Sequence, residues 1–172
     1  MVSKEELINN LNKALSMEIG AILQYLNHSY TVMGPYRDTV SDRLEKNARA
    51  EMEHMEYLSE KIVAYEGVPT TQPAAMYTAK TVTDMLNQDL AAENKAIELY
   101  DKIIKMADEY GDTDLRKTIE DITSVEYEHK ETLEKMLKMW NGRLFVNFIF
   151  YFFIFFFYLT NVFNKKERIT LF

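Results

Sequence analysis

The sequence contains one four-residue pattern twice, and this repeat constrains the fold more than any other feature. Glu51 precedes His54 by three residues, and Glu126 precedes His129 in the same way. Residues i and i+3 lie on one face of a helix, so each pattern places a carboxylate beside an imidazole. The two copies are 75 residues apart. The chain therefore reads as two related halves, each with one Glu-x-x-His pair.

The same offset relates two further pairs of residues. It carries Glu18 onto Glu93 and Tyr25 onto Tyr100. Four carboxylates and two imidazoles on four helices are the ligand set of a di-iron or di-manganese carboxylate site in a helical bundle. We therefore predict a two-metal site with the following ligands: Glu18, Glu51, His54, Glu93, Glu126 and His129.

The charges of this set explain why metals are expected. Buried carboxylates must be protonated or bound to cations, and two divalent ions neutralise four carboxylates. Glu51 and Glu126, three residues before their histidines, are the natural bridges between the ions, which leaves Glu18 and Glu93 as terminal ligands. An oxygen-rich site with one imidazole per ion suits iron or manganese better than zinc.

Several neighbours of the ligands have two interpretations each. Helical spacing places Tyr25 and Tyr100 on the face of the site. Either could give an electron during oxygen chemistry, or could be a buried space-filling residue with a hydrogen-bonded hydroxyl. For Tyr100 we favour the second interpretation. Asp89, one turn before Glu93, either holds a ligand histidine through its second ring nitrogen or is a polar residue near a helix start. His28 is assigned no role.

Composition restricts the class of protein. The 172 residues include five Gly and three Pro, which favours a single all-α domain. Cysteine is absent, which excludes disulfides, thiolate zinc sites and iron–sulfur clusters. Residues 1–142 carry 26 acidic and 16 basic side chains, so nucleic acid is not an expected partner. Charged residues at 4–6 interrupt any secretory signal, and we expect a cytoplasmic location.

Helical periodicity and turn residues predict an antiparallel four-helix bundle over residues 1–142. The first helix begins at Ser3, which with Glu6 forms a capping box, and ends before Gly34. The second starts at 36 or 41 and ends at 65, the third spans roughly 83–110, and the fourth ends near 139. The connection 67–80 is long enough to act as the lengthwise crossover of ferritin-like folds.

The composition changes abruptly after Gly142. All ten Phe residues follow this point, and Leu144 to Phe163 form a 20-residue apolar run without a charge. As a helix this run has the length of a bilayer core. Residues 143–172 are therefore a membrane anchor, a non-native extension from a reading-frame or gene-end artefact, or a segment that packs on a partner.

Residues 1–141 resemble bacterioferritin, within the ferritin-like superfamily. The similarity rests on Gln24-Tyr25 with His28, on both Glu-x-x-His pairs, on 66–69 (Glu-Gly-Val-Pro), and on Asp89 with Glu93. The second Glu-x-x-His pair favours bacterioferritin over classical ferritins. Rubrerythrins share much of this set but carry a further Glu where this chain has Ala96, and commonly a cysteine-ligated unit that is impossible here.

The resemblance implies a ferroxidase, which oxidises Fe(II) with O2 or H2O2 at the di-iron centre and stores ferric mineral in a homo-oligomer. That oligomer would be a dimer or a cage of roughly 24 subunits. The resemblance also implies haem b bound by Met52 between two subunits, although Met is common core filler. The alternative function is a non-storing di-iron or manganese–iron oxidase, or a peroxide reductase of rubrerythrin-like type.

The position of the motifs generates a prediction about the tail, because none lies beyond His129. A chain stopped at Gly142 is expected to fold, bind metal and oxidise iron in solution, whereas the full chain partitions into detergent if residues 144–163 are an anchor. Circular dichroism and metal titration of the truncated chain check this. Loss of folding on truncation would mean that the tail packs on the bundle.

Overall fold

The computed structural model describes residues 1–138, and residues 139–172 lie outside the described part of the chain. Residues 1–134 form one compact unit. A second unit begins at Lys135, and of it only 135–138 are described, as helix. The interpretations of the Phe-rich tail and the predicted boundary at residue 142 therefore fall on residues that are not described.

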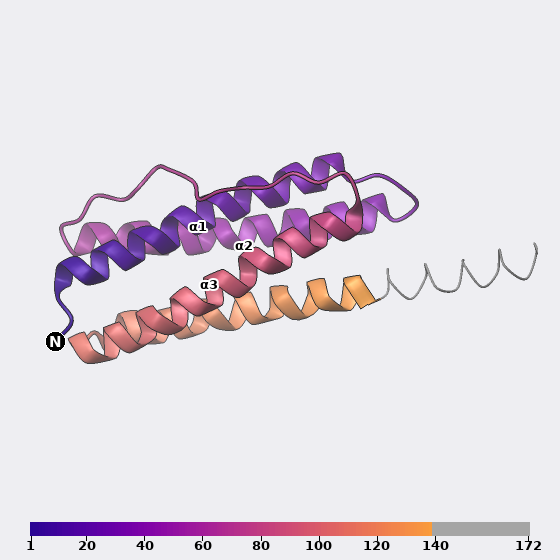
Figure 1. The fold of residues 1–172 in the computed structure, drawn as a ribbon. Helices are drawn as coiled ribbons and strands as arrows, with labels where there is room; N and C mark the ends of the chain where they lie inside the picture. Colours follow the sequence, from indigo (N-terminus) through magenta and orange to yellow (C-terminus); the bar gives the residue numbers. More distant parts are fainter. Residues whose placement is uncertain (139–172) are drawn as a thin grey trace, which may run out of the picture. The chain divides into compact units, whose positions relative to one another are not determined.

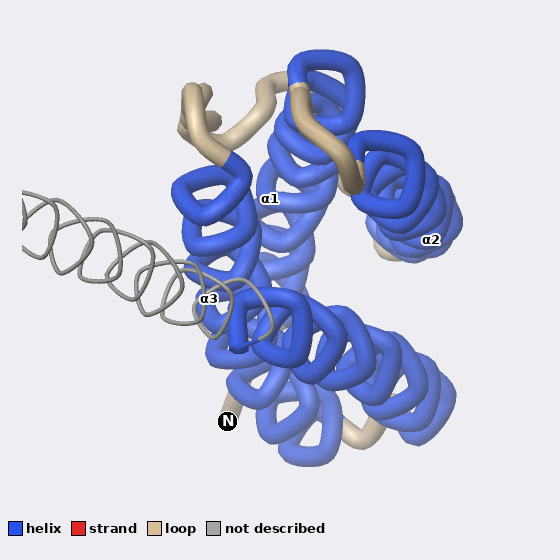
Figure 2. Tube along the Cα trace, turned by 90° about the vertical axis from the view of Figure 1, so that its right-hand side faces the viewer, coloured by secondary structure: helices blue, strands red, loops and turns tan. Residues whose placement is uncertain are grey.

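Four long helices make up the described residues, which contain no strand. They are α1 (Lys4–Thr31), α2 (Arg37–Ala64), α3 (Val82–Tyr110) and a fourth helix that begins at residue 113. Viewed nearly along their axes, the helices of the first unit surround a common interior (Figure 2). The predicted all-α four-helix bundle is confirmed for these residues.

The ends of the helices follow local chemistry. Ser3 forms the predicted capping box: its hydroxyl accepts from the Glu6 amide at 3.2 Å, and the Glu6 carboxylate accepts from the Ser3 amide. Gly111 ends α3 with φ of 89°, a left-handed conformation that glycine adopts without strain. Asp112 then accepts from the Leu115 amide at 2.7 Å and caps the start of the fourth helix.

The segment between α2 and α3 crosses the length of the bundle, as predicted, so that α2 and α3 run in the same direction (Figure 1). Polar side chains of α1 hold its backbone. The side-chain amide of Asn12 donates to the Val68 carbonyl and accepts from the Thr70 amide. The Ser16 hydroxyl donates to the Gln72 carbonyl at 2.8 Å. The crossover passes so close to Gly20 that a Cβ there would lie 3.2 Å from the Ala74 carbonyl oxygen.

The interior divides into an aliphatic part and a polar part. Leucine, isoleucine and alanine from all four helices form the main cluster, which includes Leu11, Leu58, Ile103 and Ile119. Beyond it lie buried carboxylates, imidazoles and amides. Within residues 1–138 no helix combines the length and apolarity needed to cross a bilayer.

Candidate metal centre

All six predicted ligands lie together in the interior of the first unit. α1 contributes Glu18, α2 contributes Glu51 and His54, α3 contributes Glu93, and the fourth helix contributes the second pair. None of the six residues is more than 7% exposed. Residues up to 111 positions apart in the sequence (Glu18 and His129) therefore converge because the bundle places all four helices around one point.

The six residues form two overlapping groups. One contains Glu18, Glu51, His54 and Glu126, and the other contains Glu51, Glu93, Glu126 and His129. Within each group one ligand atom from every residue lies within 4.8 Å of the others. Glu51 and Glu126 belong to both groups, which is the arrangement expected of bridging ligands.

The polar atoms here are buried without hydrogen-bond partners among the described residues. Both carboxylate oxygens of Glu51 and Glu126, and Nδ1 of both histidines, are in this state. His54 Nδ1 lies 2.9 Å from Glu51 Oε2, and His129 Nδ1 lies 2.9 Å from Glu51 Oε1. These close approaches lack the direction of a hydrogen bond. The atoms are gathered in two groups, and this carboxylate-rich, imidazole-containing set fits an iron centre.

The pKa shifts of the buried carboxyl groups show how their charge is balanced when no metal is bound. Burial raises the pKa of Glu18 and Glu93 well above the ordinary value, and the neighbouring Glu126 and Glu51 carboxylates raise it further. Both terminal carboxyls therefore hold protons in the metal-free state. Burial would also raise the pKa of Glu126, but the imidazoles of His129 and His54 outweigh it and hold that pKa at about 2.

Burial affects the pKa of the two histidines in the opposite direction from that of the carboxyl groups. Burial alone would lower the pKa of each imidazole, but the carboxylates of Glu126 and Glu51 outweigh this effect. The pKa rises to about 10 at His54 and to about 9 at His129. Two protonated imidazoles carry a charge of +2, which balances two carboxylates, while the protons on Glu18 and Glu93 neutralise the other two.

Each of the two tyrosines donates to a predicted ligand from the opposite half of the chain. The Tyr25 hydroxyl donates to Glu93, and the Tyr100 hydroxyl donates to Glu18. Burial and the facing carboxylate raise the pKa of both phenols, so they keep their protons. The interpretation of Tyr100 as a buried residue with a satisfied hydroxyl is confirmed, and its partner is a predicted ligand.

Asn47 is a participant that we did not predict from the sequence. Its side-chain amide donates to the Tyr25 hydroxyl oxygen at 3.2 Å. Asn47 lies one turn before Glu51 on α2, so helical spacing could have placed it on the site face. Tyr25 is consequently held from two sides, by Glu93 as acceptor and by Asn47 as donor.

Asp89 contacts a histidine that is not one of the predicted ligands, so neither of its two expected interpretations is correct. Its carboxylate lies 2.9 Å from Nδ1 of His28, not from a predicted ligand, and it accepts from Gln24 Nε2 at 2.9 Å. Only 1% exposed, it is not merely a polar residue near a helix start. Gln24 Oε1 and His28 Nε2 in turn contact the backbone of Tyr77 at 2.9 and 3.1 Å. This network, which includes the unassigned His28, ties the crossover to α1 and α3.

Met52 lies away from the other predicted site residues. It is on the outer face of α2 with 47% of its surface exposed, so the interpretation of Met52 as core filler is wrong for the single chain. Haem binding at this position is not tested by these contacts and stays a prediction.

Comparison with known proteins places the chain in a family. The model of the ferritin-like domain family matches residues 8–142. The chain belongs to the ferritin-like family. It is 32% identical to a bacterioferritin of Desulfovibrio desulfuricans over 127 residues, which cover 73% of this chain and 71% of that protein. A bacterioferritin of Brucella melitensis is 29% identical over 144 residues, 81% of this chain and 87% of the relative.

A solved structure supports the same family assignment. The crystal structure of a ferritin-like, diiron-carboxylate protein from Bacillus anthracis matches with a TM-score of 0.77 and 34% identity. The match covers 78% of this chain and 96% of that chain. The predicted resemblance to bacterioferritin is therefore confirmed.

The raised pKa values of His54 and His129 predict how metal binding depends on pH. Metals bind neutral imidazoles, and both imidazoles are protonated below about pH 9, so binding releases a proton from each. The apparent affinity for Mn(II) should rise with pH until about 9 to 10. Calorimetric titration in buffers of different ionisation enthalpy measures the released protons. Binding at pH 7 without proton release would contradict this electrostatic account.

Proposed function

We propose that this ferritin-like protein is a ferroxidase that oxidises Fe(II) for iron storage and detoxification. The observation that carries the proposal is the pair of ligand groups that share Glu51 and Glu126 in a buried interior. Two adjacent cation positions allow two Fe(II) ions to react as a pair. Iron is the substrate, and manganese is the alternative metal that such a ligand set accommodates.

The proposed reaction removes one electron from each of two Fe(II) ions. Dioxygen takes both electrons and two protons and becomes hydrogen peroxide; if peroxide is the oxidant, it becomes two waters. The six residues that would hold the iron are each at most 7% exposed. Tyr25, whose phenol is buried and hydrogen-bonded to Glu93, is the residue that we assign to supply an extra electron when only one iron is oxidised.

Storage of the product requires a closed homo-oligomer, and the names of the bacterioferritin relatives support iron storage as the destination of the Fe(III). The non-storing alternative has less support. The further Glu expected of a rubrerythrin-like site is replaced by Ala96, which is 8% exposed and offers no ligand atom. The cytoplasmic location stays a prediction.

Removal of a shared carboxylate tests the ferroxidase proposal. Glu51→Ala and Glu126→Ala should each abolish rapid Fe(II) oxidation, because each removes a ligand from both positions. Stopped-flow absorbance of Fe(III) after aerobic mixing measures the rate. Glu53→Ala is the matched control, since Glu53 is exposed on the same helix and belongs to neither group. Unchanged kinetics in both test variants would refute the assignment.

Storage is distinguished from turnover by the fate of the iron. After repeated aerobic additions of Fe(II), a storage protein retains many iron atoms per chain in a large particle, measured by gel filtration with metal analysis. A particle no larger than a dimer that retains only the iron of its two positions would favour the non-storing oxidase.

We also propose haem b as a second cofactor, held by Met52 from each of two subunits. The exposed position of Met52 on α2 supports this, because the thioether is reachable by a group between two copies of the chain. The dimer is expected to take up about one haem per two chains, as the symmetry of one ligand from each subunit requires. Met52→Leu should remove the haem absorbance and leave iron oxidation intact. No haem uptake by the wild-type chain would refute the proposal.

A further inference from the structure

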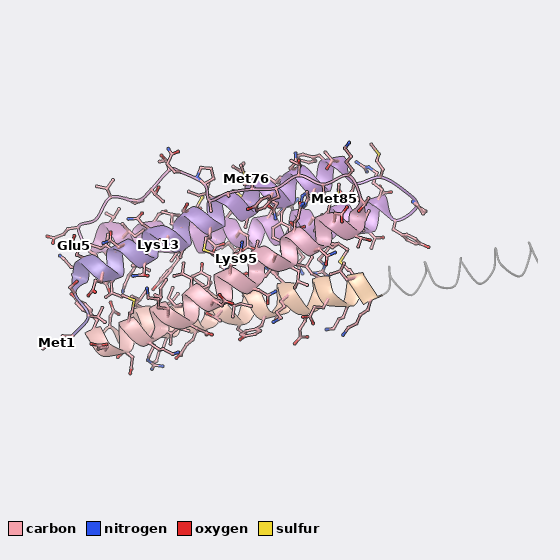
Figure 3. All side chains as sticks on the ribbon, viewed as in Figure 1. Met1, Glu5, Lys13, Met76, Met85 and Lys95 are labelled. Atoms are coloured by element: carbon pink, nitrogen blue, oxygen red, sulfur yellow. The ribbon has the colours of Figure 1, made fainter. Side chains whose placement is uncertain are left out.

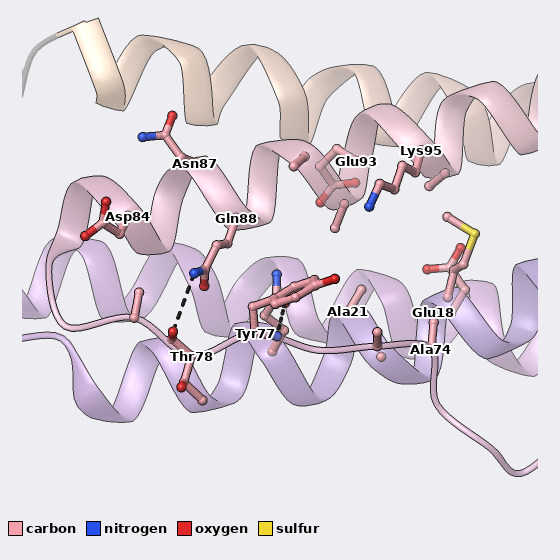
Figure 4. A pocket seen from close by; sticks show the side chains of 18 of the residues that line it. Glu18, Ala21, Ala74, Tyr77, Thr78, Asp84, Asn87, Gln88, Glu93 and Lys95 are labelled. Atoms are coloured by element: carbon pink, nitrogen blue, oxygen red, sulfur yellow. Dashed lines mark hydrogen bonds between the residues drawn. The ribbon is translucent and has the colours of Figure 1, made fainter.

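A large cavity lies beside the metal centre, between α1, α3 and the crossover (Figure 4). Its volume is about 790 Å³, and both Glu18 and Glu93 line it. Pockets of this size hold small organic molecules. An iron ion or a dioxygen molecule needs only about the volume of a water molecule, roughly 30 Å³. The cavity is therefore much larger than iron oxidation requires.

The walls of the cavity are largely methyl groups. Ala21 of α1, Ala74 of the crossover, and Ala91 and Ala92 of α3 all line it. Alanine leaves room that a larger side chain would fill, and its methyl group offers apolar contact without a competing hydrogen bond. This lining suits an apolar or aromatic body.

Two polar groups on α3 mark the two ends of this apolar wall. The amide oxygen of Gln88 is buried and has no hydrogen-bond partner among the described residues, while its amide nitrogen donates to the Thr78 carbonyl at 3.4 Å. A buried acceptor of this kind calls for a donor such as a hydroxyl. Lys95 is seven residues further along, which is about 10.5 Å along a helix.

Lys95 makes the cavity attractive to an anion. It forms no ion pair with another described residue, and Lys80 also lines the cavity. Lys13 of α1 and Lys95 line an adjoining groove and lie on the same side of the bundle (Figure 3). This lysine-bearing surface contrasts with a chain of net charge −7. Glu18, Glu93 and Asp84 also line the cavity, and Asp84 lies one turn before Gln88, so the end that favours a carboxylate is the one at Lys95.

We propose that this cavity binds a hydroxylated organic acid. The carboxylate pairs with the ammonium of Lys95, the hydroxyl donates to the Gln88 amide oxygen, and the apolar body lies against the alanine wall between them. A phenolic acid with its hydroxyl and carboxylate at opposite ends matches the two-turn separation. This site goes beyond the proposed iron chemistry and does not depend on bound metal.

Two related probes test the site by calorimetric titration of the full chain: 4-hydroxycinnamate and cinnamate, which lacks the hydroxyl. The wild-type chain should bind 4-hydroxycinnamate about three- to tenfold more tightly, the effect of one net hydrogen bond. Gln88→Leu should abolish this preference without weakening cinnamate. Lys95→Met should weaken both acids, whereas Lys105→Met, an exposed lysine on the same helix outside the cavity, should change neither.

The position of binding is tested by filling the cavity. Ala91 is exposed on α3, so Ala91→Phe leaves the core intact while it blocks the wall between Gln88 and Lys95. This variant should lose binding of both acids and keep the wild-type circular dichroism spectrum. Equal affinity of the wild-type chain for the two acids, or undiminished binding by Lys95→Met or Ala91→Phe, would overturn the proposal.

Discussion

The burial of four carboxylates at one point determines how the rest of this protein is built. Glu18, Glu51, Glu93 and Glu126 are each at most 3% exposed, on four different helices. Unbalanced, their charges would drive the helices apart. Imidazoles, tyrosine hydroxyls and protons offset them in the metal-free chain, and cations would do so when bound. Packing of the core and formation of the site are therefore one process, and metal binding adds directly to folding stability.

The crossover lies outside the interior, but it is held in place close to the buried carboxylates. It has no secondary structure, yet its backbone groups are satisfied by side chains of α1, from Asn12 at one end to His28 at the other. The network of Gln24, His28 and Asp89 links it to α3, one turn from Glu93. A segment that could have been a loose loop thus becomes one wall of the cavity beside the ligands.

Much of this arrangement could be predicted from the sequence because it is periodic. The ligand pairs follow helical spacing, and the 75-residue offset relates one half to the other. The lengthwise path of the crossover was predicted, but the contacts that hold it were not, because contacts such as Ser16 to the Gln72 carbonyl join a side chain to a backbone group and leave no sequence pattern. The partner of Asp89 was missed for a related reason. Helical spacing shows which face a side chain occupies, but not which of several histidines meets it.

The same offset shows where the two halves have diverged. The counterparts of Asp89, His28 and Asn47 are Ala14, Ile103 and Ile122, all buried and aliphatic. Asp89 lies one turn before Glu93, and Asn47 is linked to Glu93 through the Tyr25 hydroxyl. The equivalent residues near Glu18 are aliphatic. A less polar environment disfavours additional charge, so gaining a third positive charge costs more beside Glu18. The two irons of one turnover would then be electronically inequivalent, with different reduction potentials despite matching ligands.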